Sequence, residues 1–597
     1  MRALETPRRA GTRWIVPAGL GLAALLLFGA DRVLPGDAGS PGPRPFGPSR
    51  TVTSRRGVVS SAEIGASRAG AAVLADGGNA VDAAVATAFA LAVTYPQAGN
   101  LAGGGFAVGR TRDGELFALD FRETAPAGTW ERTFLLPDGS PRGNTSRQGG
   151  LSVATPGTVR GLEELHRRLG RLSWARLVAP SVGLARDGFR VPEPMRADLA
   201  QQAARLRTSL ETRRIFFRGG EPVPAGELLV QPELAGSLEA IARGGADAFH
   251  RGAMARLVAE HVRATGGVLT EEDLASYRPV WRPPLVVDFD RWRLVTMPPP
   301  SAGGVVLMSI LGQLAAAPVD LRRLDEAGRV HLVAEAMKRA FADRNEYVGD
   351  PDCVSMPLAA LLAPARLAAL GASLRLDRAT PSAKIRAGAV PREGNQTTHF
   401  SVATADGEAV AVTYTLNDAF GNGDVVPAVG VLLNNEMDDF ATQPGRPNLY
   451  GLIQGTANAV RAGARPVSSI CPTVVFENGQ PRFVLGSPGG STIPSTVLEV
   501  FLRVGPLGQS LPEAVAAPRF HHQHLPDRLD VERDAWPAAV LEELRKRGDD
   551  VRTNRWGRIG LVHAISFERD GTLLGVADPR GYGRAVSVEE LRGASRP

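Results

Sequence analysis

Hydrophobic and polar positions follow alternating helix and strand patterns from about Gly57 onward, with no internal repeat. The run from Asn79 to Val93 is small and apolar on nearly every face, which predicts a buried helix. Three glycines at positions 103–105 then lead into a predicted strand from Phe106 to Arg110. They are not a phosphate-binding loop, because they follow a helix and no G-K-[ST] motif occurs in the chain.

The middle of the chain has the pattern of helices. Residues 190–265 are charge-rich with helical spacing, which predicts a solvated helical layer. Thr270 is followed by three acidic residues, as at the capped start of a helix. A further helix, expected to be amphipathic, covers Val330 to Arg344.

The pattern changes after a polar, proline-containing stretch around 380–395. Residues 397–404 and 409–417 are rich in β-forming side chains, and Asp406-Gly407 between them predicts a hairpin. More strands are predicted at 429–434, 472–476 and 482–486, and helices near 495–503 and 535–547. Mixed strands and helices throughout indicate an α+β fold with helices layered on stacked sheets.

The first 56 residues have the composition of an export leader and a linker. Within residues 1–34, a basic head precedes an uncharged apolar run from Trp14 to Ala30. That run suits either a cleaved signal peptide or an uncleaved membrane anchor. Residues 35–56 begin with a stretch rich in proline and glycine, which predicts an extended linker. In both cases we expect the body of the protein to be extracytoplasmic, in the periplasm or secreted.

The net charge of +6 is explained by these segments. A basic balance would suggest a nucleic-acid or anionic-membrane partner. However, nine arginines and three acids lie at or before Arg56, and the remaining residues carry 59 basic and 59 acidic side chains. We therefore expect no nucleic-acid partner.

Several common functional sites are excluded or disfavoured. The only cysteines, Cys353 and Cys471, stand far apart in sequence, which excludes a disulfide scaffold and a thiolate zinc cluster but leaves their own pairing open. There is no G-x-S-x-G or H-E-x-x-H motif. His521, His522 and His524 form the only histidine cluster, for which structural hydrogen bonding is favoured over metal binding.

Thr397 is the candidate nucleophile. A two-residue loop at Asp406-Gly407 would pair Thr397 with Leu416, whereas a one-residue bulge would pair it with Thr415. Either register places the Thr415 hydroxyl near the start of the strand. A hydroxyl needs an adjacent base, and cleavage after Gln396 would free an α-amine on Thr397 itself, with a pKa of about 7.7–8.

The segment from Asn395 to Phe440 resembles the processing site and first hairpin of γ-glutamyltransferases, which are self-cleaving N-terminal nucleophile hydrolases. The resemblance extends from Gly57 to about Arg580. It includes the motifs GGNAVDAAVATAFAL, GNLAGGGF, DFRETAP, MPPPSAGG, DRNEYVGDP, RPVSSICPT, GSPGGS and APRFHHQ.

The resemblance implies a role for each matching residue. Thr397 would be the nucleophile, Thr415 its hydrogen-bond partner, and Gln396-Thr397 the cleavage site. Arg122 would grip the α-carboxylate of a γ-glutamyl donor, with help from Asn417, Ser468 and Ser469. Glu436 and Asp439 would hold its ammonium group. Gly489 and Gly490 would form the oxyanion hole, and Tyr450 would be the lid tyrosine. Without the resemblance, Arg122 would be interpreted as a surface ion pair with Glu123 or Asp120.

The resemblance also implies a four-layer αββα sandwich formed jointly by two subunits, 57–396 and 397–597, after autocleavage. The implied reaction transfers a γ-glutamyl group from glutathione to water, amino acids or peptides, without a metal or organic cofactor. The alternatives are a related acylase of the glutaryl-cephalosporin or γ-polyglutamate type, and a catalytically inactive, tethered member of the family.

Overall fold

The computed structural model describes residues 46–385, 397–446, 448 and 452–594, with the side chains of 592–594 excepted. Residues 42–597 form one compact unit, separate from residues 1–41. The predicted leader and the first half of the predicted linker, residues 35–45, lie outside the described residues. So do Gln396 and Tyr450.

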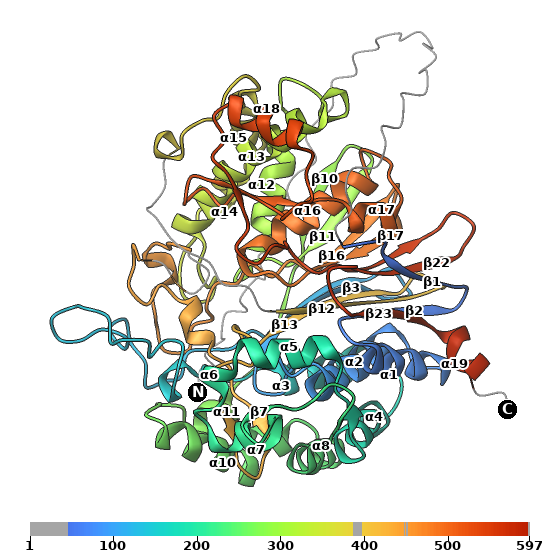
Figure 1. Ribbon diagram of the computed structural model, residues 1–597, viewed down its shortest axis with the longest axis vertical. Coiled ribbons are helices and arrows are strands. Elements are labelled where there is room, and N and C mark those ends of the chain that lie inside the picture. The colour runs from blue at the N-terminus through green and yellow to red at the C-terminus, as the bar shows by residue number, and fades with distance from the viewer. Residues whose placement is uncertain (1–45, 386–396, 447, 449–451, 595–597) are drawn as a thin grey trace, which may run out of the picture. The chain divides into compact units, whose positions relative to one another are not determined.

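Two seven-stranded antiparallel sheets form the centre of this unit (Figure 1). Sheet A has the order β1 (Arg50–Ser54), β22 (Leu573–Ala577), β21 (His563–Phe567), β17 (Gln480–Leu485), β16 (Thr473–Glu477), β11 (Trp292–Thr296) and β10 (Leu285–Phe289). Sheet B has the order β23 (Arg584–Ser587), β2 (Gly57–Ser61), β12 (Thr398–Thr404), β13 (Ala409–Thr415), β3 (Gly104–Arg110), β4 (Leu116–Asp120) and β9 (Val280–Arg282).

Both faces of sheet B are buried, because its strands present apolar side chains in alternation to two different cores. In β3, Phe106 and Val108 belong to the core shared with sheet A and its helices, whereas Ala107 belongs to the core under α1 and α2. In β13, Ala411 belongs to the core shared with sheet A, and Val412 belongs to the core under α1 and α2. Successive side chains of a strand point to opposite faces, so the two sheets pack face to face.

Helices cover the outer face of each sheet, which completes the predicted four-layer αββα sandwich (Figure 1). Sheet B is covered by α1 (Ile64–Ala75), α2 (Ala80–Thr94), α3 (Thr158–Leu169), α4 (Trp174–Arg186), α8 (Pro232–Gly244) and α10 (Gly252–Ala264). Sheet A is covered by α12 (Gly303–Ala315), α13 (Glu326–Tyr347), α16 (Ile493–Val504) and α17 (Leu511–Ala516).

The remaining elements are short. The helices are α5 (Glu193–Gln201), α6 (Ala203–Leu206), α7 (Leu210–Phe216), α9 (Asp247–His250), α11 (Glu271–Ser276), α14 (Leu358–Leu361), α15 (Pro364–Ala372), α18 (Ala538–Lys546) and α19 (Val588–Ala594). The small sheets are β5 (Phe189–Arg190) with β8 (Leu228–Leu229), β6 (Phe217–Arg218) with β7 (Glu221–Pro222), β14 (Val425–Val426) with β15 (Val431–Leu432), and β18 (Phe520–His521) with β19 (Leu529–Val531) and β20 (Val551–Thr553).

Several local predictions are confirmed. The predicted buried helix is α2, which is buried along its whole length and begins with a capping box between Asn79 and Asp82. Thr270 caps α11 in the same manner. The helical layer predicted over 190–265 is formed by α5 to α10, with three two-residue strands between α7 and α8.

Two predictions are wrong. α13 is not amphipathic, because 18 of its 22 residues are buried, charged ones included. It packs among α12, α15 and α18, so little of its surface meets water. The predicted linker also ends too late: residues 50–54 form the edge strand β1, paired with β22. The folded body therefore includes Arg50, Arg55 and Arg56.

The hairpin β12–β13 has the bulged register. Thr398 pairs with Tyr414 and Ala403 with Ala409, so the next position places Thr397 opposite Thr415. The loop is one residue longer than the two-residue turn: Gly407, at φ 90°, donates its N–H to the Thr404 carbonyl. A two-residue loop would have placed Leu416 opposite the nucleophile.

Segments from before and after Thr397 alternate within the two sheets. In sheet B, β12 and β13 lie between β2 and β3, and in sheet A, the four strands β22, β21, β17 and β16 lie between β1 and β11. Cleavage at Thr397 would therefore leave two chains joined by continuous strand pairing.

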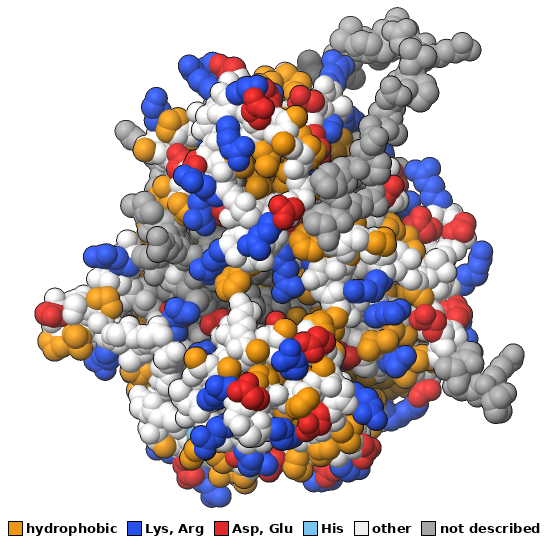
Figure 2. All heavy atoms as spheres, viewed as in Figure 1, with side chains coloured by type: hydrophobic (Ala, Val, Ile, Leu, Met, Phe, Trp, Pro, Cys, Tyr) orange, Lys and Arg blue, Asp and Glu red, His pale blue; other side chains and the backbone are white. Residues whose placement is uncertain are grey.

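Membrane-spanning helices, cysteine pairing and charged patches were considered for the described residues. None of its helices is both long and apolar enough to cross a membrane. Cys353 is exposed and Cys471 is buried, and both are free thiols. Basic and acidic side chains are interspersed over the face shown in Figure 2, rather than gathered by sign.

A close glycine contact positions Thr415, and it can be tested. A Cβ on Gly103 would lie 2.0 Å from the Thr415 carbonyl oxygen. We expect Gly103→Ala to lower the free energy of unfolding by about 1–3 kcal/mol, because backbone must move to accept the methyl group. Urea unfolding measures this. Gly236→Ala is the control, since Gly236 lies within α8 with nothing within 4 Å of the added Cβ, and that change should be neutral or stabilising. Equal midpoints for the two variants would contradict the close contact.

Candidate active site

A small cavity lies beside Thr397, where sheet B meets the segments that follow β13 and precede β16 and α16. It brings together seven of the predicted site residues. Its lining consists of Arg344, Thr397, Thr415, Glu436, Asp439, Leu452, Val467, Ser468, Ser469, Ile470, Gly490 and Ile493.

The two threonine hydroxyls meet at the start of the hairpin. Thr397 Oγ1 lies 3.5 Å from Thr415 Oγ1, the long limit of a hydrogen bond. Thr415 Oγ1 also accepts the backbone N–H of Asn417 at 2.8 Å, and Asn100 donates to the Thr415 carbonyl at 2.9 Å. Thr415 is thus held from both sides and presents its hydroxyl to the nucleophile.

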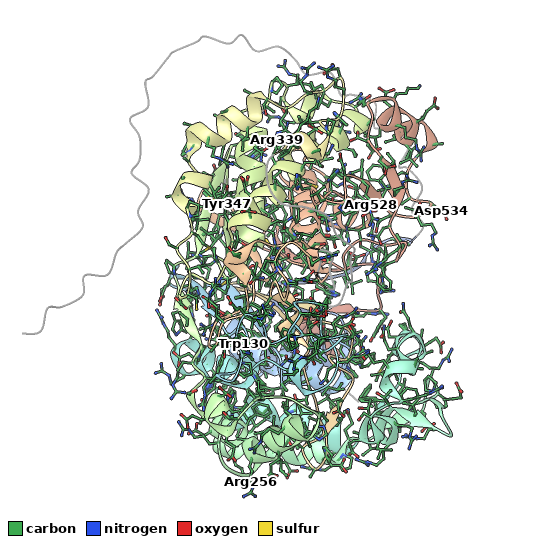
Figure 3. All side chains as sticks on the ribbon, turned by 90° about the vertical axis from the view of Figure 1, so that its left-hand side faces the viewer. Trp130, Arg256, Arg339, Tyr347, Arg528 and Asp534 are labelled. Atoms are coloured by element: carbon green, nitrogen blue, oxygen red, sulfur yellow. The ribbon has the colours of Figure 1, made fainter. Side chains whose placement is uncertain are left out.

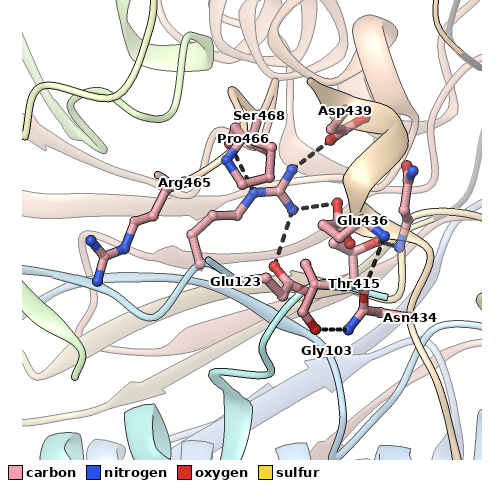
Figure 4. A network of polar contacts seen from close by, with 12 residues as sticks. Gly103, Glu123, Thr415, Asn434, Glu436, Asp439, Arg465, Pro466 and Ser468 are labelled. Atoms are coloured by element: carbon pink, nitrogen blue, oxygen red, sulfur yellow. Dashed lines mark hydrogen bonds and ion pairs between the residues drawn. The ribbon is translucent and has the colours of Figure 1, made fainter. Parts of the chain in front are cut away.

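Arg122 is completely buried and lies in a cluster of three acids (Figure 4). Its Nη1 is 2.5 Å from Glu436 Oε1 and 3.4 Å from Glu123 Oε2, and its Nη2 is 2.5 Å from Asp439 Oδ2. The Nε donates to the Pro466 carbonyl at 3.2 Å. The expected ion pair of Arg122 with Glu123 is present, but its expected location at the surface is wrong, because both side chains are buried.

The acids of this cluster hold their protons unusually well. Burial raises the pKa of Glu123 to about 7 and that of Glu436 to about 8, although Arg122 opposes the shift in both. Burial likewise raises the pKa of Asp439 well above its usual value. Burial lowers the pKa of Arg122, but the three carboxylates outweigh it and the net pKa is raised. The titration belongs to the cluster as a whole, because the groups are in direct contact.

The acids also keep acceptor positions unused. Glu436 Oε2 and Asp439 Oδ1 are buried and accept no hydrogen bond from the described residues. Both residues line the cavity, so a cation entering it would find two carboxylate oxygens without a donor. An ammonium group, with three N–H donors, matches this requirement.

The opposite wall is formed by the serine pair and the start of α16. Ser468 Oγ accepts the backbone N–H of Ile470 at 3.2 Å, and Ser469 Oγ accepts from Arg344 Nη2 at 3.4 Å. Gly489 and Gly490 have φ values of 146° and 54°, which favour glycine, and they lead into α16. The N–H groups at a helix N-terminus stabilise negative charge.

Three predicted residues are near the cavity without lining it. Arg122 lies behind Glu436 and Asp439, and Gly489 precedes the lining residue Gly490. Asn417, at φ 75°, donates its side-chain amide to the Asn435 carbonyl at 2.9 Å.

Sequence reasoning missed Arg344 and Glu123, although both lie in motifs that carried the resemblance. The signal for Arg344 was available: it lies seven residues after Met337 and fourteen after Val330, on one stripe of a helix. Gln454 was also missed, and it accepts from Arg344 Nη1 at 2.9 Å and donates to the Asp439 carbonyl at 3.0 Å.

The histidine cluster makes hydrogen bonds within the fold. His521 Nδ1 lies 2.7 Å from Ser495 Oγ, and His524 Nε2 lies 3.1 Å from the Ser382 carbonyl. Across the described ranges, no group of three or more His, Cys, Asp or Glu side chains is arranged to hold a metal ion.

Comparison with known proteins identifies the family. The family model described as Gamma-glutamyltranspeptidase matches residues 66–588. The glutathione hydrolase proenzyme of Escherichia coli (strain K12) is 44% identical over 542 residues, which cover 90% of this chain and 92% of that protein. The chain belongs to the γ-glutamyltranspeptidase family.

Solved structures agree with this assignment. The γ-glutamyltranspeptidase of Helicobacter pylori superposes with a TM-score of 0.54 at 38% identity, over 55% of this chain and 94% of that one. A cephalosporin acylase from Bacillus halodurans has a TM-score of 0.78 at 26% identity, over 93% of this chain and 99% of that one. The fold of this chain is therefore shared with a γ-glutamyltranspeptidase and with a cephalosporin acylase.

The raised pKa of Glu436 predicts a pH-dependent stability for this γ-glutamyltranspeptidase. The folded chain holds a proton that the unfolded chain releases near pH 4.3, so the free energy of unfolding should fall as pH rises from about 5 to about 8. Glu436→Gln keeps the size of the side chain and removes this titration. We expect its stability, measured by urea unfolding at pH 5.5 and 8.0, to fall less between the two values. Glu272→Gln, on the exposed start of α11, is the control and should behave as the wild type. An unchanged pH dependence in Glu436→Gln would contradict the raised pKa.

Proposed function

We propose that this protein is a self-processing γ-glutamyltransferase and glutathione hydrolase. The observation that carries the proposal is the cavity in which Thr397 and Thr415 face the acids Glu436 and Asp439. A γ-glutamyl donor is a zwitterion at one end and an amide at the other. The site offers acids and an arginine to the zwitterionic end of the donor, and it offers a hydroxyl nucleophile to the amide end. Membership of the family supports the same activity.

The reaction begins with attack by Thr397 Oγ1 on the γ-carbonyl carbon of the donor. After cleavage at Gln396-Thr397, the freed α-amine of Thr397 takes the hydroxyl proton and passes it to the leaving amine. Thr415 orients the nucleophile through the contact of the two hydroxyls. A γ-glutamyl ester forms, which water, an amino acid or a peptide then resolves.

The donor head group is recognised by opposite charges. Its ammonium group binds Glu436 and Asp439, and its α-carboxylate binds Arg122, Ser468 and Ser469, with Asn417 in support. Arg122 donates to one oxygen of each acid, Glu436 Oε1 and Asp439 Oδ2. The ammonium can therefore bind the other two oxygens, Glu436 Oε2 and Asp439 Oδ1, while the guanidinium keeps its contacts.

The backbone N–H groups of Gly489 and Gly490 stabilise the oxyanion of the tetrahedral intermediate. The glycine conformations at φ 146° and 54° and the adjacent start of α16 support this role. Removing one such donor typically costs about 3 kcal/mol of transition-state stabilisation. Tyr450 is proposed as the lid over the donor.

Processing uses the same hydroxyl against the Gln396 carbonyl carbon, by an N-to-O acyl shift. The ester that forms is then hydrolysed, giving a large chain that ends at Gln396 and a small chain of residues 397–597. The alternation of their strands in both sheets supports a stable heterodimer. The basic, apolar leader supports an extracytoplasmic location, with a cleaved signal or a retained anchor.

A related acylase is the second candidate, because the fold is shared with a cephalosporin acylase. A glutaryl chain has no α-amine, however, and would leave the Glu436 and Asp439 oxygens without a partner. Two buried carboxylates beside the nucleophile favour a donor that carries an ammonium group.

Processing is tested first. The purified protein should run as two bands, and the smaller should begin at Thr397 and have a mass of about 21 of the 63.0 kDa. Thr397→Ala should remain one band and release no cysteinylglycine from glutathione, because it lacks the hydroxyl that both reactions use. Substantial activity in that variant would remove Thr397 from its proposed role.

The activity is tested by turnover of glutathione with and without an acceptor dipeptide. Release of cysteinylglycine and glutamate alone defines a hydrolase, and a new γ-glutamyl dipeptide defines a transferase. A stable single band that releases no cysteinylglycine would refute the proposal. Turnover of a glutaryl amide in preference to glutathione would favour the acylase.

Arg122 is tested by Arg122→Lys. A lysine keeps the charge but not the forked geometry, so we expect the donor KM to rise about 10-fold or more while processing continues. Processing is read from the two bands and KM from initial rates. Equal loss of processing and of donor binding would make Arg122 a structural residue.

A further inference from the structure

Arg344 differs from every other buried arginine in the described part of the chain. Six arginines are buried: Arg122, Arg339, Arg344, Arg465, Arg519 and Arg580. Five of them have a carboxylate within 4.0 Å. Arg344 has none among the described residues.

The partners of Arg344 are all neutral. Its Nη1 donates to Gln454 at 2.9 Å and to Asn345 at 3.3 Å, and its Nη2 to Ser469 at 3.4 Å. Its Nε is buried and has no hydrogen-bond partner among the described residues. A buried cation without a counter-ion costs several kcal/mol, which a fold does not accept without compensation.

The position of Arg344 indicates where the compensation comes from. The residue lies near the end of α13, whose course is marked by Arg339 and Tyr347 in Figure 3, and its side chain lines the cavity beside Thr397. A ligand carboxylate bound in that cavity would supply a counter-ion. Burial lowers the pKa of Arg344 to about 10, so the side chain stays charged at neutral pH.

Arg122 alone is a poor match for a carboxylate, because three acids surround it. The guanidinium of Arg122 donates to Glu123, Glu436 and Asp439, whereas that of Arg344 donates to none of them. Arg344 is therefore the cation of the cavity that no protein acid contacts directly among the described residues, and the carboxylate of the donor can pair with it.

We infer that Arg344 determines the specificity of the cavity for donors that carry an α-carboxylate. It acts by orienting the Ser469 hydroxyl and by placing on that side of the cavity a positive charge that is attracted by Asp439 but has no carboxylate within 4.0 Å among the described residues. This inference rests on the proposed γ-glutamyl donor, and it adds to the carboxylate site a residue from α13, more than a hundred residues before the serine pair.

The test compares two chromogenic donors that differ only in the α-carboxylate: γ-glutamyl-p-nitroanilide and 4-aminobutyryl-p-nitroanilide. The readout is the ratio of their kcat/KM values. Arg344→Gln should lower this ratio about 10- to 100-fold, through a higher KM for the γ-glutamyl donor, because a hydrogen-bonded charge is lost. Arg344→Lys, which keeps the charge, should retain part of the preference.

The matched control is Arg366→Gln. Arg366 pairs with Asp343, the neighbour of Arg344 in sequence, and does not line the cavity. The ratio of the kcat/KM values of the two donors in Arg366→Gln should equal that of the wild type. Ser469→Ala combined with Arg344→Gln should cost less than the sum of the single changes, because the two side chains contact each other.

The outcomes separate the two proposals. A wild type that does not turn over γ-glutamyl-p-nitroanilide refutes the proposed function. An active wild type whose ratio is unchanged in Arg344→Gln, or whose two donors lose activity equally, refutes the role of Arg344. If Arg344→Gln does not yield folded protein, Arg344→Lys decides: a wild-type KM and ratio in that variant, together with additive effects of Ser469→Ala, would overturn the inference.

Discussion

The register of the β12–β13 hairpin is the constraint on which the site depends. Thr397 immediately precedes β12, which is buried on both faces, and the bulged turn at Ala405 to Gly407 places Thr415 opposite it. A shift of one residue would turn Thr415 to the other face of the sheet. The turn geometry therefore sets which side chain lies opposite the nucleophile at the far end of the strands. Gly103, in close contact with the Thr415 carbonyl, holds the same register from the neighbouring strand.

Charge is the second organising feature. The site buries three acids and two arginines where water cannot screen them, and the arginines are not equivalent. Arg122 is bound by the acids, whereas the hydrogen-bond partners of Arg344 among the described residues are neutral. The raised pKa values of Glu123 and Glu436 favour protonation of the acids, which reduces repulsion among them. The ammonium group of a zwitterionic ligand would pair with the acids, and its carboxylate would pair with Arg344. The charges of the cavity are thus complementary to those of a zwitterion.

The architecture also explains how a chain can be cut at its catalytic residue and keep its structure. Apart from the edge strand β23, the strands that follow Thr397 lie inside the two large sheets, between strands that precede it. The cut would separate covalent segments without exposing a sheet edge, so the hydrogen bonds and apolar contacts of the sandwich would be retained. Proximity of the new amine to its own hydroxyl then requires no rearrangement of the core.

Local signals in the sequence determined much of the fold. The apolar run of α2, its Asn79 cap, the Thr270 cap and the Asp406-Gly407 turn each depend on residues close together in the chain, and each was predicted. The order of motifs was enough to name the family and the four layers. The nucleophile was predictable because the hairpin signal and the processing motif coincide at Thr397.

Only the tertiary structure decided the features that depend on distant residues or on burial. The turn signal allowed two registers, and packing of β13 against β3 selected one. α13 looked amphipathic because its charges repeat along the helix, but α12, α15 and α18 surround it and bury those charges. Arg122 meets Glu436 across 314 residues of sequence, and Arg344 is identified only by the carboxylate it lacks. The physical reason is that desolvation and pairing are set by neighbours in space, whereas the sequence records directly only the neighbours along the chain.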